Sequence, residues 1–404
     1  EELPANVVKR VMRTATPETR NLINQFLKYP ENSTGSIMTT EFVDLKENMT
    51  VEDALKRIRR TGPDKETINI CYVMDERRHL IGVLSIRNLL LSEDDDIIGD
   101  IMERNFISVQ TLDDQESTAQ AFSKYDFLAL PVVDKENRMV GIVTFDDAMD
   151  VIEEETTEDF EKMAEVFAGA LRHYTKGWGD GFNWDIKYWE LWNEPDGVNN
   201  MWCLPEGDGT RGSAEFAKRD KIRRDLFCKF FVTCLKRLKK EFPECKFGGP
   251  AMCWFHKEYF RDMLKACKEA DVAPDFISWH YYGSDPSVII KWAASARELC
   301  DSFGFKDCEL IINEWHYLGS YSWGGLRNTD PKVRKQVWEG PASHNGIDSS
   351  CFTLSTMAQM QTSKYDQSYF YGCRHTGAWG YMDEHRRKYK IWSALKLFGS
   401  IMKE

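Results

Sequence analysis

The 404-residue chain lacks long hydrophobic runs, an apolar leader and closely paired cysteines. No stretch approaches 18 consecutive apolar residues, so we expect no membrane-spanning helix. The start, Glu1-Glu2-Leu3-Pro4, is acidic, so we expect no secretory signal peptide. None of the 11 cysteines forms a Cys-x-x-Cys pair, which argues against zinc-ribbon and thioredoxin-type sites. We therefore expect reduced thiols in a cytoplasmic protein.

Charge and cysteine divide the chain at the same place. Residues 1–163 hold 34 Asp and Glu against 19 Lys and Arg, a formal charge of −15, and the remainder carries +3, which together give the −12 of the chain. Cys71 is the only cysteine of the acidic part. The length is too great for one ordinary core, and 42% hydrophobic residues can fill several. We predict two unrelated domains that join near residue 165.

The acidic part contains an internal repeat. Residues 72–75 end in Asp75, and Gly82 follows after seven positions; residues 131–134 end in Asp134, and Gly141 follows at the same spacing. An Ile-Met pair, a strand-like segment and a helix precede the Asp in both copies, at Ile37-Met38 and Ile101-Met102. Each copy is predicted as strand–helix–strand–turn–strand–helix, with the Asp and Gly on either side of a turn between buried strands.

Three segments identify a family resemblance in this part: residues 29–39, 125–134 and 141–155. They resemble a tandem CBS pair, and more closely the cytosolic region of MgtE-type magnesium transporters. The resemblance implies α+β repeats with these bounds: a helical tail of a transporter N-terminal domain at 1–33, a first CBS repeat at 34–99 and a second at 100–160. It also implies a homodimer that forms through the CBS pair.

The same resemblance implies regulation by Mg²⁺, which screens acidic faces and draws the domains together. Hard divalent cations prefer carboxylate oxygens, and Mg²⁺ tends to keep part of its water shell. Asp147, Asp150, Glu154 and Glu158 follow at steps of three or four residues, so one helix face would carry stacked like charges. A solvated acidic helix is the alternative interpretation. The positions that match the family's metal-binding carboxylates are Asp114, Glu116, Asp126, Asp147, Asp150, Glu155 and Glu158.

Other ligands of the acidic part are less well supported by its sequence. A surface of this charge repels nucleic acid and anionic lipid. CBS pairs often bind adenine nucleotides, and in this family a strand of the first repeat is usually followed by Arg-Asp. Here the pair is Arg87-Asn88, which removes a carboxylate from ribose recognition. Nucleotide binding therefore stays open.

Short apolar strands alternate with long helices after residue 164, which predicts a parallel α/β arrangement. The chemistry-bearing residues lie where two of the predicted strands end. Asn193-Glu194-Pro195 follows one strand, and Glu314-Trp315 closes a later one. Strand candidates are Asp185–Trp192, Lys246–Gly249, Phe276–His280, Glu309–Asn313 and Ser368–Gly372, with helices at Ser213–Glu241, Phe255–Lys268 and Pro286–Phe303. In a parallel barrel such ends face the active site, and two carboxylates in one cleft are what glycoside hydrolysis requires.

Residues 174–196, 247–251 and 278–283 resemble clan A retaining glycoside hydrolases, especially family 39 β-xylosidase-like enzymes. The resemblance implies that Glu194 is the general acid/base and Glu314 the nucleophile, and that the substrate is a β-linked, xyloside-like sugar cleaved without a cofactor. If a complete barrel forms, we expect a raised pKa at Glu194, because a general acid must be protonated near neutral pH and because Trp192 and Glu314 would both favour its neutral form. The implied substrate-binding residues are Asn193, His280, Tyr282 and Trp379. His280 and Trp379 each have an alternative interpretation as core residues.

The predicted second domain, 161–404, supplies five strands, which the resemblance numbers four to eight of a (β/α)₈ barrel. A complete barrel needs eight. The transporter's membrane helices, which would follow Glu155–Val166, are also missing here, so we interpret the chain as an apparent chimera; a natural two-domain protein is the alternative. Two functions stay open: a retaining glycosidase portion fused to a Mg²⁺-sensing module, or a non-catalytic sensing domain that carries an inactive barrel fragment. Sugar specificity is expected in loops such as 205–212 and 321–341.

Overall fold

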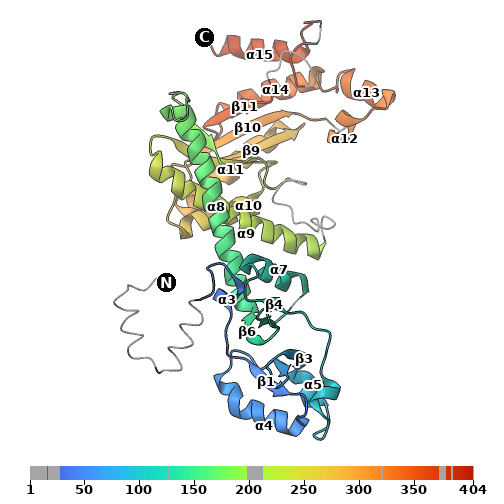
Figure 1. Cartoon of the computed structure of the whole chain (residues 1–404). Helices are drawn as coiled ribbons and strands as arrows, with labels where there is room; N and C mark the ends of the chain where they lie inside the picture. Colours follow the sequence, from blue (N-terminus) through green and yellow to red (C-terminus); the bar gives the residue numbers. More distant parts are fainter. Residues whose placement is uncertain are drawn as a thin grey trace. The chain divides into compact units, whose positions relative to one another are not determined.

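In the computed structural model, the chain divides into two compact units, Glu1–Glu158 and Asp159–Glu404 (Figure 1). The structure describes residues 16, 28–125, 127–197, 213–319, 322–372, 379–383 and 385–403. In this part of the chain no helix is both long and apolar enough to cross a membrane. The predicted helical tail at 1–33 lies outside the described residues, apart from Thr16 and residues 28–33.

The first unit consists of two copies of one small sheet, which confirms the predicted repeat. In each copy the first strand pairs parallel with the second, and the second pairs antiparallel with the third. The sheets have the orders β1-β2-β3 and β4-β5-β6. The elements are α3 Thr34–Ile37, β1 Val43–Lys46, α4 Val51–Thr61, the 3-10 turn Gly62–Asp64, β2 Ile70–Met74, β3 Leu80–Ser85, α5 Ile86–Leu91, α6 Ile98–Ile101, β4 Val109–Gln110, α7 Gln115–Tyr125, β5 Ala129–Val133, β6 Met139–Thr144 and α8 Phe145–Lys176.

The Asp of each repeat shapes the hairpin turn that follows it. Asp75 Oδ1 accepts hydrogen bonds from the N–H groups of Arg77 and His79, each at 2.8 Å. Asp134 Oδ1 accepts the equivalent bonds from Glu136 and Arg138, each at 2.9 Å. At the turn these carboxylates therefore accept hydrogen bonds from backbone N–H groups in place of a neighbouring strand. This is why Asp is favoured there.

The Gly of each repeat permits a close approach of the Ile-Met segment from the other repeat. A Cβ at Gly82 would collide with Met102, and a Cβ at Gly141 would collide with Met38 and with the carbonyl of Thr39. Bridges at Val83–Glu103 and Thr39–Ile142 hold these segments in place. The spacing from Asp to Gly in the sequence thus corresponds to one hairpin. A backbone segment of the other repeat passes close to the last strand of this hairpin at the Gly.

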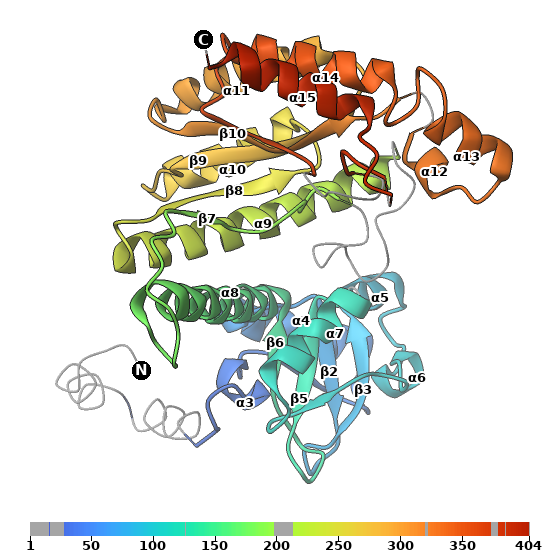
Figure 2. The same cartoon turned by 90° about the horizontal axis from the view of Figure 1, so that it is seen from above.

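The second unit is built on a five-stranded, fully parallel sheet with the order β11-β10-β9-β8-β7 (Figure 2). The predicted α/β fold class is confirmed, as a twisted sheet that resembles part of a barrel. The elements, besides the second part of α8, are β7 Tyr188–Glu190, α9 Ala214–Glu241, β8 Lys246–Met252, α10 Lys257–Glu269, β9 Phe276–Gly283, α11 Pro286–Phe303, β10 Glu309–Tyr317, α12 Ser322–Arg327, α13 Pro331–Trp338, α14 Ile347–Met360, β11 Gln367–Phe370 and α15 Lys390–Ile401.

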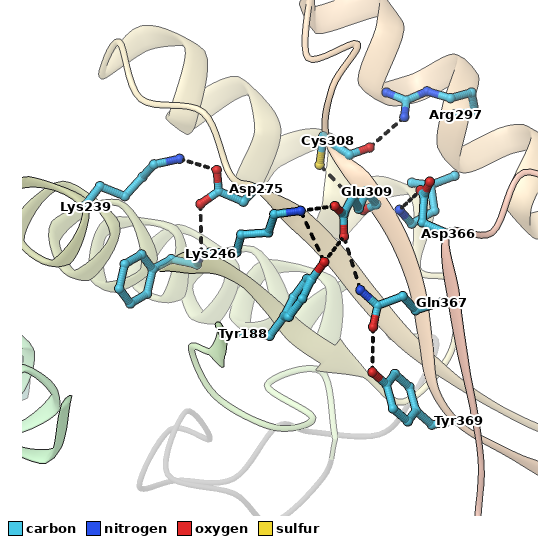
Figure 3. A network of polar contacts seen from close by, with 12 residues as sticks. Tyr188, Lys239, Lys246, Asp275, Arg297, Cys308, Glu309, Asp366, Gln367 and Tyr369 are labelled. Carbon is cyan, nitrogen blue, oxygen red and sulfur yellow. Dashed lines mark hydrogen bonds and ion pairs between the residues drawn. The ribbon is translucent and has the colours of Figure 1, made fainter. Parts of the chain in front are cut away.

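The two faces of this sheet differ in chemistry. Phe247, Ile277 and Leu310 on one face are buried against α9, α10 and α11 in one large apolar core. The other face is polar at the beginnings of the strands. There Tyr188 donates a hydrogen bond to Glu309 at 2.9 Å, and Lys246 forms an ion pair with the same carboxylate (Figure 3). Helices therefore stabilise the first face, and charged and aromatic side chains occupy the second.

Two aspartates fix the alignment of neighbouring strands at the same end of the sheet. Asp275 lies just before β9, and its carboxylate accepts the N–H of Phe247 on β8 at 2.8 Å. Asp366 lies just before β11, and its carboxylate accepts the N–H of Leu310 on β10 at 2.8 Å (Figure 3). Since both carboxylates satisfy donors at strand starts, this end of the sheet is stabilised locally.

Candidate active site

An irregularity in β10 brings Glu314 beside His280. Ile312 on β10 is aligned with Trp279 on β9, but the next aligned pair is Glu314 with His280, so Asn313 is an extra residue. Such a bulge places the following side chain on the face opposite to the one that strict alternation along the strand would give it. Asn313 and Glu314 consequently both serve the polar face of the sheet.

Glu194 reaches the same place from the loop after β7. Its φ of 52° lies in the left-handed region, as does the φ of 53° at Ala251 in the neighbouring strand β8. The N–H of Glu194 donates to the carbonyl oxygen of Ala251 at 2.9 Å. Non-glycine residues in this region cost of order 1–3 kcal/mol, and such strain is concentrated at functional sites.

The imidazole of His280 lies between the two carboxylates. Its Nδ1 is 2.9 Å from Glu194 Oε1 and 3.5 Å from Glu314 Oε2. The two oxygens cannot be farther apart than the sum of these distances, a limit that admits the carboxylate separation of about 5–5.5 Å found in retaining glycosidases. Nδ1 faces acceptors only, so we assign its proton there. Nε2 is buried and has no hydrogen-bond partner among the described residues. A neutral ring nitrogen without a proton tolerates this better than the N–H of a charged imidazolium would.

Tyr282 and an aromatic cluster surround Glu314 on the other side. The Tyr282 hydroxyl donates to Glu314 Oε2 at 2.7 Å, and burial together with this carboxylate raises the pKa of Tyr282. Trp379 packs edge-to-face on Tyr282 with ring centroids 5.5 Å apart. Trp379 also contacts His316 and His344, so part of its surface serves packing, as the alternative interpretation held. Tyr282, in contrast, touches a predicted catalytic carboxylate directly.

The expectation of a raised pKa at Glu194 is wrong for this structure. His280 donates to the Glu194 carboxylate, which lowers the pKa of Glu194 below its usual range despite partial burial. Trp192, which we expected to favour the neutral form of this carboxyl group, packs against Phe230 with ring centroids 5.7 Å apart. Among the described residues, burial instead raises the pKa of Glu190 and of Asp196, the latter to about 6, and sequence reasoning assigned neither.

These two carboxyl groups connect separate segments of the second unit. Asn313 donates to Glu190 at 2.7 Å, although solvent still reaches part of Glu190 from the polar face. Asp196 is 3% exposed and accepts the N–H of Cys253 at 2.8 Å, which ties the loops after β7 and β8 together. The only signal in the sequence was their proximity to Glu194.

A cavity of about 660 Å³ opens at the carboxyl ends of the strands. Its lining includes Glu194, Tyr282 and three tryptophans, Trp254, Trp292 and Trp323. Asn193 is exposed beside Glu194 but is not part of this lining. The structure thus places Glu194, Glu314, His280 and Tyr282 in direct contact, Trp379 one ring away, and Asn193 at the surface.

The predicted metal-binding carboxylates lie mostly at helix starts in the first unit. Asp147 caps α8 through Thr144, whose hydroxyl donates to it at 2.6 Å, and Asp114 accepts from the N–H of Ser117 at 3.1 Å. Gln115, next to Asp114, donates to Glu155 at 3.1 Å, so Glu155 contacts the residue that follows Asp114. The remaining candidates are Glu116, which accepts from Gln120, and Asp150 and Glu158, which are exposed on α8; Asp126 lies outside the described residues.

No three carboxylate, histidine or cysteine side chains in the described part of the chain converge tightly enough to hold a metal ion directly. Mg²⁺ usually keeps several waters and binds few protein ligands. Magnesium binding by these residues stays a prediction.

Comparison with known proteins identifies the domain type of the first unit. Residues 35–93 and 98–154 match the CBS domain model. The first unit carries a tandem CBS pair. The chain is 44% identical over 158 residues to the magnesium transporter MgtE of Thermus thermophilus, which is 39% of this chain and 35% of that protein. The chain thus spans about a third of the length of this relative.

The glycosidase resemblance is weaker in sequence. The chain is 28% identical over 129 residues to a β-xylosidase of Geobacillus stearothermophilus, which is 31% of this chain and 21% of that protein. The solved structure of a glucosidase from Croceicoccus marinus aligns with 60% of this chain and 46% of its own, with 23% identity and a TM-score of 0.42. At that score the structural likeness carries no argument about function.

Replacement of His280 by Phe should raise the pKa of Glu194, because the ring nitrogen is the main group that lowers it. Titration of ¹³C-labelled glutamate carboxyl groups by NMR measures this directly. Tyr282→Phe is the matched control, since it removes a donor to Glu314 and none to Glu194. An unchanged or lower pKa of Glu194 in His280→Phe would show that the imidazole does not donate to it.

Proposed function

We propose that the second unit supplies the acid/base and nucleophile of a retaining β-glycoside hydrolase, with Glu194 and Glu314 in these roles. The observation that supports this proposal most strongly is the shared contact of both carboxylates with His280 Nδ1. The distance limit set by these contacts is compatible with the carboxyl separation of about 5–5.5 Å in retaining enzymes, where one carboxylate attacks the sugar directly.

The surrounding residues fit the two roles. The Tyr282 hydroxyl holds Glu314 in position and disperses its charge, which a nucleophile needs before it attacks the anomeric carbon. Glu194 must carry a proton to assist departure of the leaving group. Its pKa is low in this structure, and a bound sugar that excludes water would raise it by desolvation. His280 then positions both groups rather than reacting itself.

Covalent labelling tests the proposal without the need for rapid turnover. A 2-fluoro β-xyloside with a good leaving group should attach to Glu314 of the full chain, seen as a mass increase on the peptide that contains it. Glu314→Gln should abolish the label. Glu194→Gln should still label with an activated leaving group, and should slow by about 10²–10⁴-fold with a poor one, because only the latter needs an acid. Exposed Glu298→Gln on α11 is the control.

Absence of any adduct on the unmodified chain would contradict this function. An adduct that persists in Glu314→Gln would contradict the assignment of the nucleophile while leaving the reaction type in place.

We propose a second function for the first unit, a Mg²⁺-sensing regulatory module. The 44% identity to a magnesium transporter supports it, as does the run of carboxylates at the start of α8. Asp147, Asp150 and Glu154 follow at one-turn spacing, so their mutual repulsion would be relieved by a cation.

Mg²⁺ should stabilise the full chain against thermal unfolding, since a ligand that binds only the native state adds free energy by mass action, about 2.7 kcal/mol at a hundredfold excess over Kd. Calorimetry with MgCl₂ and with NaCl at equal ionic strength separates binding from screening. The double variant Asp150→Asn, Glu154→Gln should reduce the shift, and Glu298→Gln should not. A midpoint that follows ionic strength alone would refute Mg²⁺ sensing.

The CBS pair should form a homodimer, as its family resemblance implies. Leu91 on α5 is 77% exposed and Phe145 at the start of α8 is 43% exposed, so helices that follow the last strand of each repeat present apolar surface. Sedimentation velocity should show dimers at tens of micromolar, weakened by Leu91→Glu and unchanged by Leu397→Glu on α15. A monomer at all concentrations would contradict the proposal.

A further inference from the structure

One arginine lies on the wall of the cavity that contains Glu194. Arg327 is the last residue of α12 and lines this cavity together with Trp323. The two residues are four positions apart, so they lie on the same face of the helix. Among the described residues that line the cavity, Arg327 is the only cation.

A short series of contacts connects this wall with the proposed nucleophile. The ring of Trp323 packs against Tyr282 with centroids 4.9 Å apart, and the Tyr282 hydroxyl donates to Glu314. Trp323 also lies 5.7 Å from Trp379, measured between ring centroids. The face of α12 that carries Arg327 is therefore one aromatic ring away from the residue that holds Glu314.

Arg327 differs in its partners from two other arginines of this unit. Arg172 pairs with Glu241, and Arg297 pairs with Asp301. In the described part of the chain no carboxylate or carbonyl oxygen pairs with Arg327, whose side chain is exposed toward the cavity. A guanidinium presents a planar set of donors that matches a carboxylate or sulfate better than a neutral hydroxyl.

We propose that Arg327 is a specificity-determining residue that selects sugars with an anionic substituent, so that the substrate class is acidic β-glycosides rather than neutral xylosides. The inference rests on the proposed glycosidase function of the same site. The tryptophans offer apolar surface for the sugar ring, Glu194 and Glu314 flank the glycosidic bond, and Arg327 pairs with the charged group. A neutral xyloside would leave the guanidinium without a counter-charge.

Binding to the full chain tests this without catalysis, through the fluorescence of the tryptophans that line the cavity. The probes are methyl β-D-glucuronide, methyl β-D-glucoside 6-sulfate and methyl β-D-xyloside. We expect at least one anionic sugar to bind about fivefold tighter than the xyloside or better, as charge-assisted hydrogen bonds predict. The glucuronide and sulfate arms show which anion is preferred.

Arg327→Gln should abolish this preference by weakening the binding of the anionic sugar, whereas Arg334→Gln on α13, outside the cavity, should leave the preference unchanged. Equal affinity for anionic and neutral sugars, or a preference that survives Arg327→Gln, would overturn the role of Arg327 but not the glycosidase. Failure of every sugar to bind would overturn both proposals.

Discussion

The contact of one imidazole nitrogen with two carboxylates is the interaction on which the candidate site depends. His280 comes from the middle of the parallel sheet, Glu314 from the next strand and Glu194 from the loop after the edge strand β7. Parallel strands place their carboxyl ends at one edge, so residues far apart in sequence can meet there. The bulge at Asn313 brings Glu314 to the same place, because without the bulge Glu314 would point into the apolar core.

The two ends of this sheet have different roles: polar groups at one end are stabilised by local partners, and the other end carries the candidate site. At the strand starts, Asp275 and Asp366 satisfy backbone donors, and Glu309 is neutralised by Lys246, so polar groups there have local partners. At the strand ends, Glu194 lies in a strained conformation, and among the described residues the buried Asp196 has an oxygen without a hydrogen-bond partner. A protein tolerates such costs where the rest of the structure compensates for them.

The sequence predicted much of the fold because its signals were local. The spacing of Asp75 to Gly82 and of Asp134 to Gly141 records a turn and a backbone crossing, and both are set by a few neighbouring residues. All five predicted strands of the second unit are present, since apolar runs between long helices have few other solutions. The carboxylate pair could be proposed because strand ends are visible in the sequence.

The remaining features depend on contacts between distant segments. The bulge at Asn313 is a matter of register between strands, which no local pattern encodes. The low pKa of Glu194 arises from His280, 86 positions away. Arg327 lies in a loop region that we expected to set specificity, yet its place beside Trp323 and Tyr282 follows only from packing. Asn193, predicted from its position in a motif, lies at the surface.

The protonation of His280 tests the central account most directly. The ¹⁵N chemical shifts of its two ring nitrogens, measured on the histidine-labelled chain near neutral pH, show which nitrogen carries the proton. Our account predicts a protonated Nδ1 that donates to Glu194 and faces Glu314, with Nε2 bare. A bare Nδ1 with the proton on Nε2 would contradict it, because two carboxylates would then face a lone pair and could not be held together by this ring.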